Sequence, residues 1–376
     1  MEKRKLEKLG VETSLLGYGC MRFPMTADGK IDEAEAEKLL DTALAAGINY
    51  IDTAWPYHNG ESEPFVGKVL SKYPRDSYYL ATKLPVWLVK SLDEVDTYLE
   101  KQLERLRTDH IDFYLMHSLD KEDWDRMVEM GTVKRLEELK AEGKIRYLGF
   151  SFHDKYEVFE EILNYRDWDF CQIQLNYMDT DIQAGLKGYE LTAKKNIPLV
   201  IMEPVKGGTL ASFSEDLEEE FHKLDRKASV ASYALRWVGS LPNVKVILSG
   251  MSSMEQLQDN LATFADFKAL STEEKDTIDK VVAAIRARVQ NGCTGCRYCM
   301  PCPMGVNISG CFSAWNTYHM YRNYKMVSGQ WENSIGEKGQ PKNCIECGKC
   351  EKACPQKLPI REDLKKVQKD FDARVW

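Results

Sequence analysis

Residues 31–57 read IDEAEAEKLLDTALAAGINYIDTAWPY, and they contain one helix and one strand of the fold that the sequence predicts. The first part of the stretch has apolar residues three and four positions apart, a spacing typical of an amphipathic helix. The second part contains a short apolar run at 49–53, which is typical of a buried strand. This strand ends in Asp52, and Tyr57 follows in the next loop.

The same alternation of apolar runs and helical patterns continues from residue 15 to residue 265. Eight strands that alternate with helices over about 250 residues predict a (β/α)8 barrel. An open, doubly wound sheet is the alternative, but no glycine fingerprint for a dinucleotide follows the first strand, so the barrel is favoured. The predicted strands are 15–22, 49–53, 79–83, 111–117, 147–152, 171–177, 199–203 and 244–250.

Four polar side chains end or follow the second, third and fourth predicted strands. They are Asp52, Tyr57, Lys83 in LATKL, and His117 in FYLMHS. In barrels of this kind the catalytic side chains lie at the carboxyl ends of the strands. Each residue alone has an ordinary structural explanation, such as a helix cap or a surface charge. Their convergence on one end of the barrel favours a catalytic site.

These residues suit the reduction of a carbonyl group. A ketone or aldehyde that accepts hydride develops negative charge on its oxygen and needs a proton donor near neutral pH. Tyr57 can donate that proton if the ammonium of Lys83 lowers its pKa. Asp52 would hold Lys83, and His117 would orient the carbonyl and stabilise the charge on its oxygen. Three tryptophans lie in or near the rim loops: Trp55, Trp87 and Trp124. They either line a substrate pocket or pack in the core or on the surface.

At these positions the sequence resembles the aldo-keto reductase family. The resemblance covers residues 5–265 and rests on GINYIDTAWPYHNGESE, LATKL, IDFYLMHS, GFSFHD, CQIQLNY and ILSGMSSMEQLQDN. It implies Tyr57 as the proton donor, Lys83 and Asp52 as the residues that tune it, and His117 as the substrate-orienting group. It also implies a nicotinamide cofactor in an extended form across the strand ends.

The resemblance further implies a set of cofactor contacts. Ser151 and Gln172 would hold the nicotinamide carboxamide, and Asn260 would approach the adenine. The pattern Ser252-x-x-Glu255 predicts a helix start whose free N–H groups face a phosphate, with an ordinary helix cap as the alternative. The full implied set is Asp52, Ser151, Gln172, Met202, Gly250, Ser252, Gln256 and Asn260.

This sequence departs from the family pattern at three of these places. Phe152 follows Ser151 where the family usually has Asn, so His153 is an alternative contact. Met202 stands where an aromatic residue commonly stacks on the nicotinamide. Gln256 stands where many members have a basic residue for the 2′-phosphate. The family default is therefore NADP, with NAD as the alternative.

The last part of the chain contains two runs of four cysteines, each closed by a Cys-Pro dipeptide. The runs are Cys293, Cys296, Cys299 and Cys302, and then Cys344, Cys347, Cys350 and Cys354. The second run has the spacing of bacterial [4Fe–4S] proteins. Zinc is the alternative, but a third cysteine at the same interval and the Cys-Pro both favour iron. The first run has two residues, not three, before its last cysteine, so Cys311 is an alternative fourth ligand. Buried structural thiols are the expectation for Cys20 and Cys171.

In two-cluster ferredoxins the fourth cysteine of each run ligates the other cluster. On that basis Cys354 joins the first three cysteines of the first run, and Cys302 joins the first three of the second. Similar tails, MGVNI and QKLPI, follow the two Cys-Pro sites, so the region resembles the α-helical ferredoxin type with an internal near-repeat. We predict two [4Fe–4S] clusters, with one as the alternative. The predicted domains are a barrel at 1–290 and a mostly helical iron–sulphur domain at 291–376.

The charge and hydropathy of the chain limit the classes of partner that it is expected to bind. The 376 residues contain 51 basic and 59 acidic side chains, a net charge of −8, which is not the footprint of a protein that binds nucleic acid or anionic lipid. No export signal or membrane-crossing apolar stretch is present, so a cytoplasmic protein is predicted. A reducing compartment also suits iron-bound thiolates. The expected partners are a small carbonyl or alcohol substrate and, as a further hypothesis, a redox protein.

Three hypotheses for function follow. The first is an NAD(P)H-dependent carbonyl reductase whose clusters have a structural, sensing or electron-transfer role. The second is an electron-transfer oxidoreductase in which the clusters feed single electrons to a reaction in the barrel. The third is a non-catalytic subunit that senses the nicotinamide cofactor.

Overall fold

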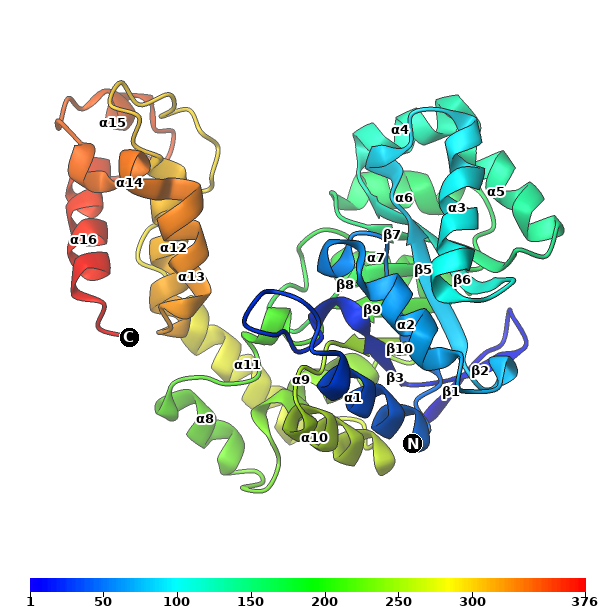
Figure 1. Cartoon of the computed structure of the whole chain (residues 1–376). Coiled ribbons are helices and arrows are strands. Elements are labelled where there is room, and N and C mark those ends of the chain that lie inside the picture. The colour runs from blue at the N-terminus through cyan, green and yellow to red at the C-terminus, as the bar shows by residue number, and fades with distance from the viewer. The chain divides into compact units, whose positions relative to one another are not determined.

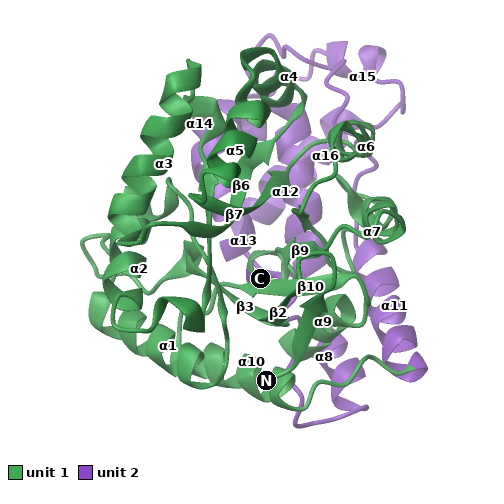
Figure 2. Ribbon diagram, turned by 90° about the vertical axis from the view of Figure 1, so that its right-hand side faces the viewer, with its two compact units in different colours: residues 1–207, 231–271 green, residues 208–230, 272–376 purple.

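The computed structural model describes residues 1–376, which form two compact units (Figure 2). Unit 1 comprises Met1–Gly207 and Ala231–Ser271, and unit 2 comprises Gly208–Val230 and Thr272–Trp376. Within unit 2, Arg288 binds Asp216 at 2.7 Å, which ties the segment before Val230 to the C-terminal helices. The predicted domain boundary at residue 290 was placed from the cysteine pattern, and it stays a prediction.

Unit 1 is a closed barrel of eight parallel strands, so the predicted fold class is confirmed (Figure 1). Each of the eight predicted strands overlaps an observed one. Around the barrel the order is β10, β3, β4, β5, β6, β7, β8 and β9. Their bounds are β3 Leu16–Gly19, β4 Tyr50–Asp52, β5 Tyr79–Leu84, β6 Ile111–Leu119, β7 Ile145–Phe152, β8 Phe170–Gln174, β9 Leu199–Met202 and β10 Val244–Ser249.

Helices connect the strands and bury their apolar sides against the barrel. Helix α1, for example, buries Leu39, Leu40 and Ala43, and its N-terminus is capped by the carboxylate of Asp32. The helices are α1 Glu33–Ala45, α2 Ser62–Leu70, α3 Leu92–Leu106, α4 Lys121–Met130, α5 Thr132–Ala141, α6 Tyr156–Tyr165, α7 Gly185–Lys194, α9 Val230–Gly239 and α10 Met254–Ala265.

A hairpin that the sequence argument missed precedes the barrel. Its strands, β1 Lys3–Leu6 and β2 Val11–Ser14, pair antiparallel. Leu6 is fully buried in the same apolar cluster as Tyr50 and Phe113, which point into the barrel. The hairpin therefore closes the amino-terminal end of the barrel and leaves the carboxyl end for a site.

Strand register places two of the predicted site residues on one inner surface. Asp52 lies opposite Ala81 of the neighbouring strand β5. Since side chains alternate along a strand, Ala81 and Lys83 point to the same side, and Lys83 lies one step nearer the carboxyl end. Asp52 and Lys83 therefore meet near the carboxyl end of the barrel.

Unit 2 is helical around the cysteine loops. Helices α12 and α16 each begin at the isoleucine that ends a Cys-Pro tail, Ile308 and Ile360, and both isoleucines are buried. This equivalence agrees with the predicted near-repeat. The elements are α8 Glu215–His222, α11 Thr272–Arg286, α12 Ile308–Tyr321, α13 Lys325–Gly329, a π-helix Gln330–Ile335, α14 Gly336–Gly339, α15 Lys349–Ala353 and α16 Ile360–Ala373. None of the helices in the structure has both the length and the apolar character needed to cross a bilayer.

Candidate active site and cysteine centre

Three of the four predicted catalytic residues meet around the amine of Lys83. Its Nζ donates to Asp52 Oδ1 and to the carbonyl of Thr53, both at 2.7 Å, and lies 3.5 Å from the hydroxyl of Tyr57. Lys83 is fully buried, and Asp52 is 2% exposed. A buried ammonium with a carboxylate on one side and a phenol on the other can tune proton transfer at the phenol.

The charges around Tyr57 act in opposite directions. Burial alone lowers the pKa of Lys83, but Asp52 and Tyr57 raise it above its ordinary value, so the amine stays charged. Burial raises the pKa of Tyr57, and the Lys83 ammonium opposes that shift without reversing it. The effect predicted for Lys83 is therefore present, but desolvation of the phenolate outweighs this one ammonium, so the pKa of Tyr57 is not lowered overall. Tyr57 holds its proton at neutral pH.

His117 lies beside Tyr57, with its ring centroid 6.1 Å from that of the phenol. Burial, and then the charges of Lys83 and His153, hold the pKa of His117 well below its ordinary value, so its imidazole is neutral. Its Nδ1 is buried without a hydrogen-bond partner. Of the three rim tryptophans, Trp87 packs against this imidazole at 5.0 Å, whereas Trp124 lies in the core.

The residues implied for the carboxamide lie on neighbouring strands. Ser151 is paired with Gln172 across β7 and β8, and both are buried. Gln172 Nε2 donates to the sulphur of Met202 at 3.4 Å, while its Oε1 is buried without a partner. An unpaired buried acceptor suits the amide N–H of a nicotinamide carboxamide, so these side chains fit this group. His153, the alternative contact, has an exposed side chain.

The predicted cap at Ser252 was wrong by one residue. Helix α10 is capped by Ser253, whose Oγ accepts from the N–H of Gln256. The hydroxyl of Ser252 donates to the carbonyl of Arg22 at 2.7 Å, and its N–H is bound by the Gln256 side chain at 2.8 Å. The extended backbone of Ser253, with φ −141° and ψ 158°, is what aims its oxygen at the first turn. Asn260, one further turn along α10, donates to Ser249 Oγ at 2.9 Å.

Arg22 lies next to two of the predicted cofactor contacts, and no pattern in the sequence indicated it. It was placed inside the first strand, but β3 ends at Gly19 and a short 3-10 turn, Cys20–Arg22, follows. A Cβ on Gly250 would come within 3.1 Å of the Arg22 side chain, so a larger residue here would push the arginine away by a few tenths of an ångström. The stem of Arg22 lies along Gly250, its backbone carbonyl accepts from Ser252, and its guanidinium lies near Gly207.

A buried hydrogen-bond network that the sequence argument missed supports the backbone of Lys83. Glu63 is fully buried and accepts from Thr82 at 2.7 Å and from Gln102 at 2.6 Å, while Arg105 lies 3.2 Å from its other oxygen. The amide of Gln102 also donates to the carbonyl of Lys83 at 3.0 Å. The network joins α2, α3 and β5, so sequence spacing alone gives no signal for it.

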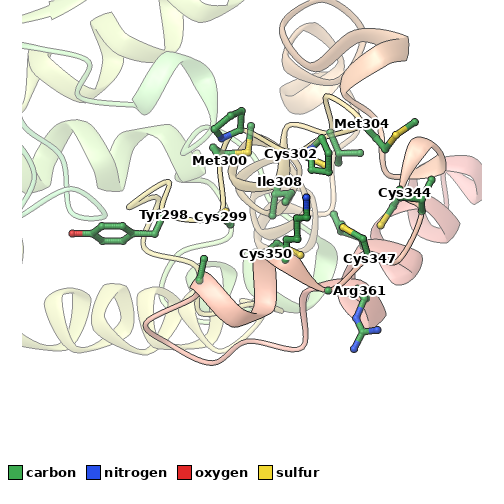
Figure 3. Close-up of a pocket in the computed structure, with 18 residues that line it drawn as sticks. Tyr298, Cys299, Met300, Cys302, Met304, Ile308, Cys344, Cys347, Cys350 and Arg361 are labelled. Carbon is green, nitrogen blue, oxygen red and sulfur yellow. The ribbon is translucent and has the colours of Figure 1, made fainter.

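The cysteines fall into two groups. The charges of Cys293, Cys296 and Cys354 all act on the thiol of Cys299, whose pKa is raised mainly by burial. The thiols of Cys302, Cys344, Cys347 and Cys350 line a cavity of about 170 Å³ that Cys299 also borders (Figure 3). These two groups have the same members as the two ligand sets of the crossed assignment predicted from the sequence. Four cysteines in each group suit a cluster, in which each iron takes one cysteine.

The other three cysteines are buried thiols. Cys20 and Cys171 lie in the barrel core, as expected. Cys311 lies in the core of unit 2, where its Sγ donates to the carbonyl of Gly339, and burial raises its pKa to about 12. Because a cluster ligand must be a thiolate, this environment does not support Cys311 as the alternative ligand.

Comparison with known proteins covers both parts of the chain. The sequence model of the aldo/keto reductase family matches residues 15–283, and that of a 4Fe-4S dicluster domain matches residues 292–358. The uncharacterised oxidoreductase YqkF of Bacillus subtilis is 29% identical over 74% of this chain and 99% of its own length. The NADH-specific methylglyoxal reductase of Escherichia coli is 27% identical over 68% of this chain and 89% of its own length.

A solved structure matches in the same way. The holo form of the aldo-keto reductase AKR11C1 from Bacillus halodurans has a TM-score of 0.61 and 29% identity, and the match covers 74% of this chain and 96% of that one. The family match spans most of the barrel that holds Asp52, Tyr57, Lys83 and His117. The chain therefore belongs to the aldo/keto reductase family, as an oxidoreductase that carries a 4Fe-4S domain.

Proposed function

We propose that the barrel reduces an aldehyde or ketone to an alcohol with NAD(P)H. The observation that carries this proposal is the buried amine of Lys83, which is bound to Asp52 and placed 3.5 Å from the Tyr57 hydroxyl near the carboxyl end of the barrel. The E. coli relative is named as a methylglyoxal reductase, which supports a carbonyl substrate.

In this mechanism Tyr57 gives its proton to the carbonyl oxygen. The Lys83 ammonium stabilises the phenolate that remains, and Asp52 keeps that ammonium in place. His117, being neutral, can donate a hydrogen bond that orients the carbonyl and stabilises its developing charge. When bound, the nicotinamide would supply the hydride.

Ser151 and Gln172 would hold the carboxamide, with Met202 beside them. Gly250, Ser252, Gln256 and Asn260 would contact the rest of the cofactor, with Arg22 as the nearby cation. Since the Gln256 amide is neutral and already bound to the N–H of Ser252, we propose that any preference for NADP depends on Arg22. Titration of NADPH and NADH into the wild type and into Arg22→Gln tests this point.

We propose two [4Fe–4S] clusters in unit 2. Cys293, Cys296, Cys299 and Cys354 would hold one, and Cys302, Cys344, Cys347 and Cys350 the other. The thiol neighbours of Cys299 and the four thiols around the cavity support this assignment.

Replacement of Tyr57 by Phe tests the carbonyl reductase. The change removes the proposed proton donor, so NAD(P)H-linked reduction of a panel of aldehydes and ketones should fall at least about 100-fold in kcat. Tyr165→Phe is the matched control, because Tyr165 is 52% exposed on α6 and takes no part in the site. Unchanged reduction in Tyr57→Phe would rule out the mechanism.

A further inference from the structure

The cysteine region differs in charge from the rest of the chain. Residues 291–376 contain thirteen Lys and Arg against eight Asp and Glu, a net charge of +5, so residues 1–290 carry −13 of the total of −8. From residue 291 to residue 331 there is no acidic residue at all. A basic region beside the two cysteine runs, in an otherwise acidic protein, favours a ligand of opposite charge.

A groove concentrates this charge next to one cysteine group. It has a volume of about 720 Å³ and shares Cys344, Arg361 and Leu364 with the cysteine cavity. Four basic residues line it, Lys342, Arg361, Lys365 and Lys369, against two acidic ones, Glu346 and Asp372.

Three of these basic residues form a stripe on α16. Arg361, Lys365 and Lys369 are four residues apart, so they share one face of the helix and extend about 12 Å along it. Part of the positive charge offsets the negative charge of thiolate-bound clusters. The stripe extends two helical turns away from the cysteines, which is farther than is needed to offset the charge of the clusters.

The ion pairs in the groove are exposed and easily exchanged. Lys365 pairs with Glu346 at 2.8 Å, and Lys342 with Glu337 at 2.9 Å. Such pairs contribute about 0–1 kcal/mol each, so an incoming carboxylate can replace them at little cost. Lys369 forms no ion pair within the chain.

Apolar side chains are exposed at the neighbouring cavity. Ile345, between two cysteines, is 60% exposed, and Met304 is 46% exposed, and both line the cavity. Figure 3 shows Met304 beside Cys344, whereas Tyr298 points away from the thiols. Exposed apolar residues with a charged rim are typical of protein contact sites. Small interfaces of this kind suit the brief complexes of electron transfer.

We propose that this face, formed by Met304, Ile345, Cys347 and the α16 groove, docks an acidic one-electron carrier protein. The acidic surface of the carrier would replace the intrachain partners of Lys342 and Lys365 and pair with Lys369, next to the cluster of Cys302, Cys344, Cys347 and Cys350. Once docked, the carrier would give one electron to the cluster that these cysteines would hold, and no bond would be made or broken. This docking does not depend on the carbonyl reduction proposed for the barrel.

A binding experiment tests the proposal on anaerobically prepared full-length protein with its clusters. The probe is a bacterial two-cluster ferredoxin, a small acidic carrier, titrated by calorimetry at low and at physiological ionic strength. The wild type should bind, and binding should weaken with salt. Lys365→Glu with Lys369→Glu should weaken binding at least about tenfold. Lys275→Glu with Lys280→Glu, two exposed lysines on α11 of the same unit, should change it less than about twofold.

The remaining outcomes overturn the proposal. These are no saturable binding at low ionic strength, equal loss in the two double variants, or a self-associated form whose contact blocks the probe. Iron content is measured for each variant, because a lost cluster would also abolish electron transfer. If the double variant loses iron, the binding experiment is repeated with Lys369→Glu alone, because Lys369 lies two helical turns from Arg361. Unchanged affinity of this variant for the ferredoxin would refute docking at the groove.

Discussion

The pair of Lys83 and Asp52 is a buried charge pair, and it contributes to stability only while both partners are present. The second oxygen of Asp52 is buried and has no hydrogen-bond partner, so the carboxylate depends on the single ammonium. Removing one member leaves an uncompensated charge in a low dielectric, which costs more than the pair itself contributes.

Lys83→Met should therefore lower the free energy of unfolding by about 3–5 kcal/mol, because Asp52 is left buried and unpaired. Lys83→Met combined with Asp52→Leu should recover much of that loss while remaining inactive. Urea unfolding of the two variants and the wild type measures both effects. Equal stability of the single and double variants would show that the charge of Asp52 is not the cause.

His117 should make stability depend on pH in a defined window. Its folded pKa lies below the unfolded value of about 6.5, so on acidification the unfolded state takes up the proton first. The contribution is complete above about pH 6.5 and is lost as the pH falls toward the folded pKa, by up to about 1.4 kcal/mol per pH unit. His117→Gln should flatten the fall in stability between about pH 6.5 and 5.

Urea unfolding at a series of pH values measures this difference. The pKa of His58 is also lowered by burial, but His58 is present in both proteins and cancels in the comparison. Parallel pH profiles of the wild type and His117→Gln would contradict the neutral, desolvated state of this imidazole.

At the scale of elements, close packing of α2 and α3 fixes the groups behind Lys83. Gly67 of α2 lies so near the end of α3 that an added Cβ would come within 2.3 Å of the Arg105 carbonyl. Helix α3 carries Gln102 and Arg105, which bind Glu63. The spacing of these two helices therefore positions the network that holds the Lys83 backbone.

Gly67→Ala should force the helices apart, with a stability loss of about 1–3 kcal/mol and a lower kcat. The matched control is Lys68→Ala, because Lys68 is the next residue on α2 and is exposed; its loss should stay within about 1 kcal/mol. Chemical unfolding and carbonyl reduction measured on both variants test the argument. A Gly67→Ala protein as stable as the control would show that the contact relaxes without cost.

For the molecule as a whole, the crossed cysteine assignment that we propose would make the two loops of unit 2 depend on each other. We expect about eight iron and eight sulphide per chain in anaerobically prepared protein. Cys354→Ser, although it lies in the second run, should weaken the cluster of Cys293, Cys296 and Cys299. Iron assay and electron paramagnetic resonance of the reduced protein measure which cluster is affected.

Cys311→Ala is the control for this experiment. Cys311 is buried and bound to the Gly339 carbonyl, so its removal should leave the iron content unchanged. An uncrossed arrangement would instead show Cys354→Ser disturbing only the cluster of Cys344, Cys347 and Cys350. An iron content of about four per chain in the wild type would instead indicate a single cluster.

Much of the fold and the centre of the site could be predicted from the sequence because their signals are local. The eight strands follow from short apolar runs, and Asp52, Lys83 and His117 are visible at strand ends. Groups defined by contact were missed. In the sequence Glu63 resembles an exposed helix residue, but packing of α3 buries it. Leu6 likewise gains its apolar neighbours only when the barrel forms.

The barrel, the family and the iron–sulphur domain could be predicted before any folding was considered, because strand periodicity and cysteine spacing are properties of the chain. The protonation states and the partners of the polar side chains followed from the folded structure instead. Burial, a property of the folded state, raises the pKa of Tyr57 against the effect of Lys83. The local backbone likewise makes Ser253, not Ser252, the cap of α10. The stripe of Arg361, Lys365 and Lys369 can be seen in the sequence, but its place beside Cys344 comes from the packing of unit 2.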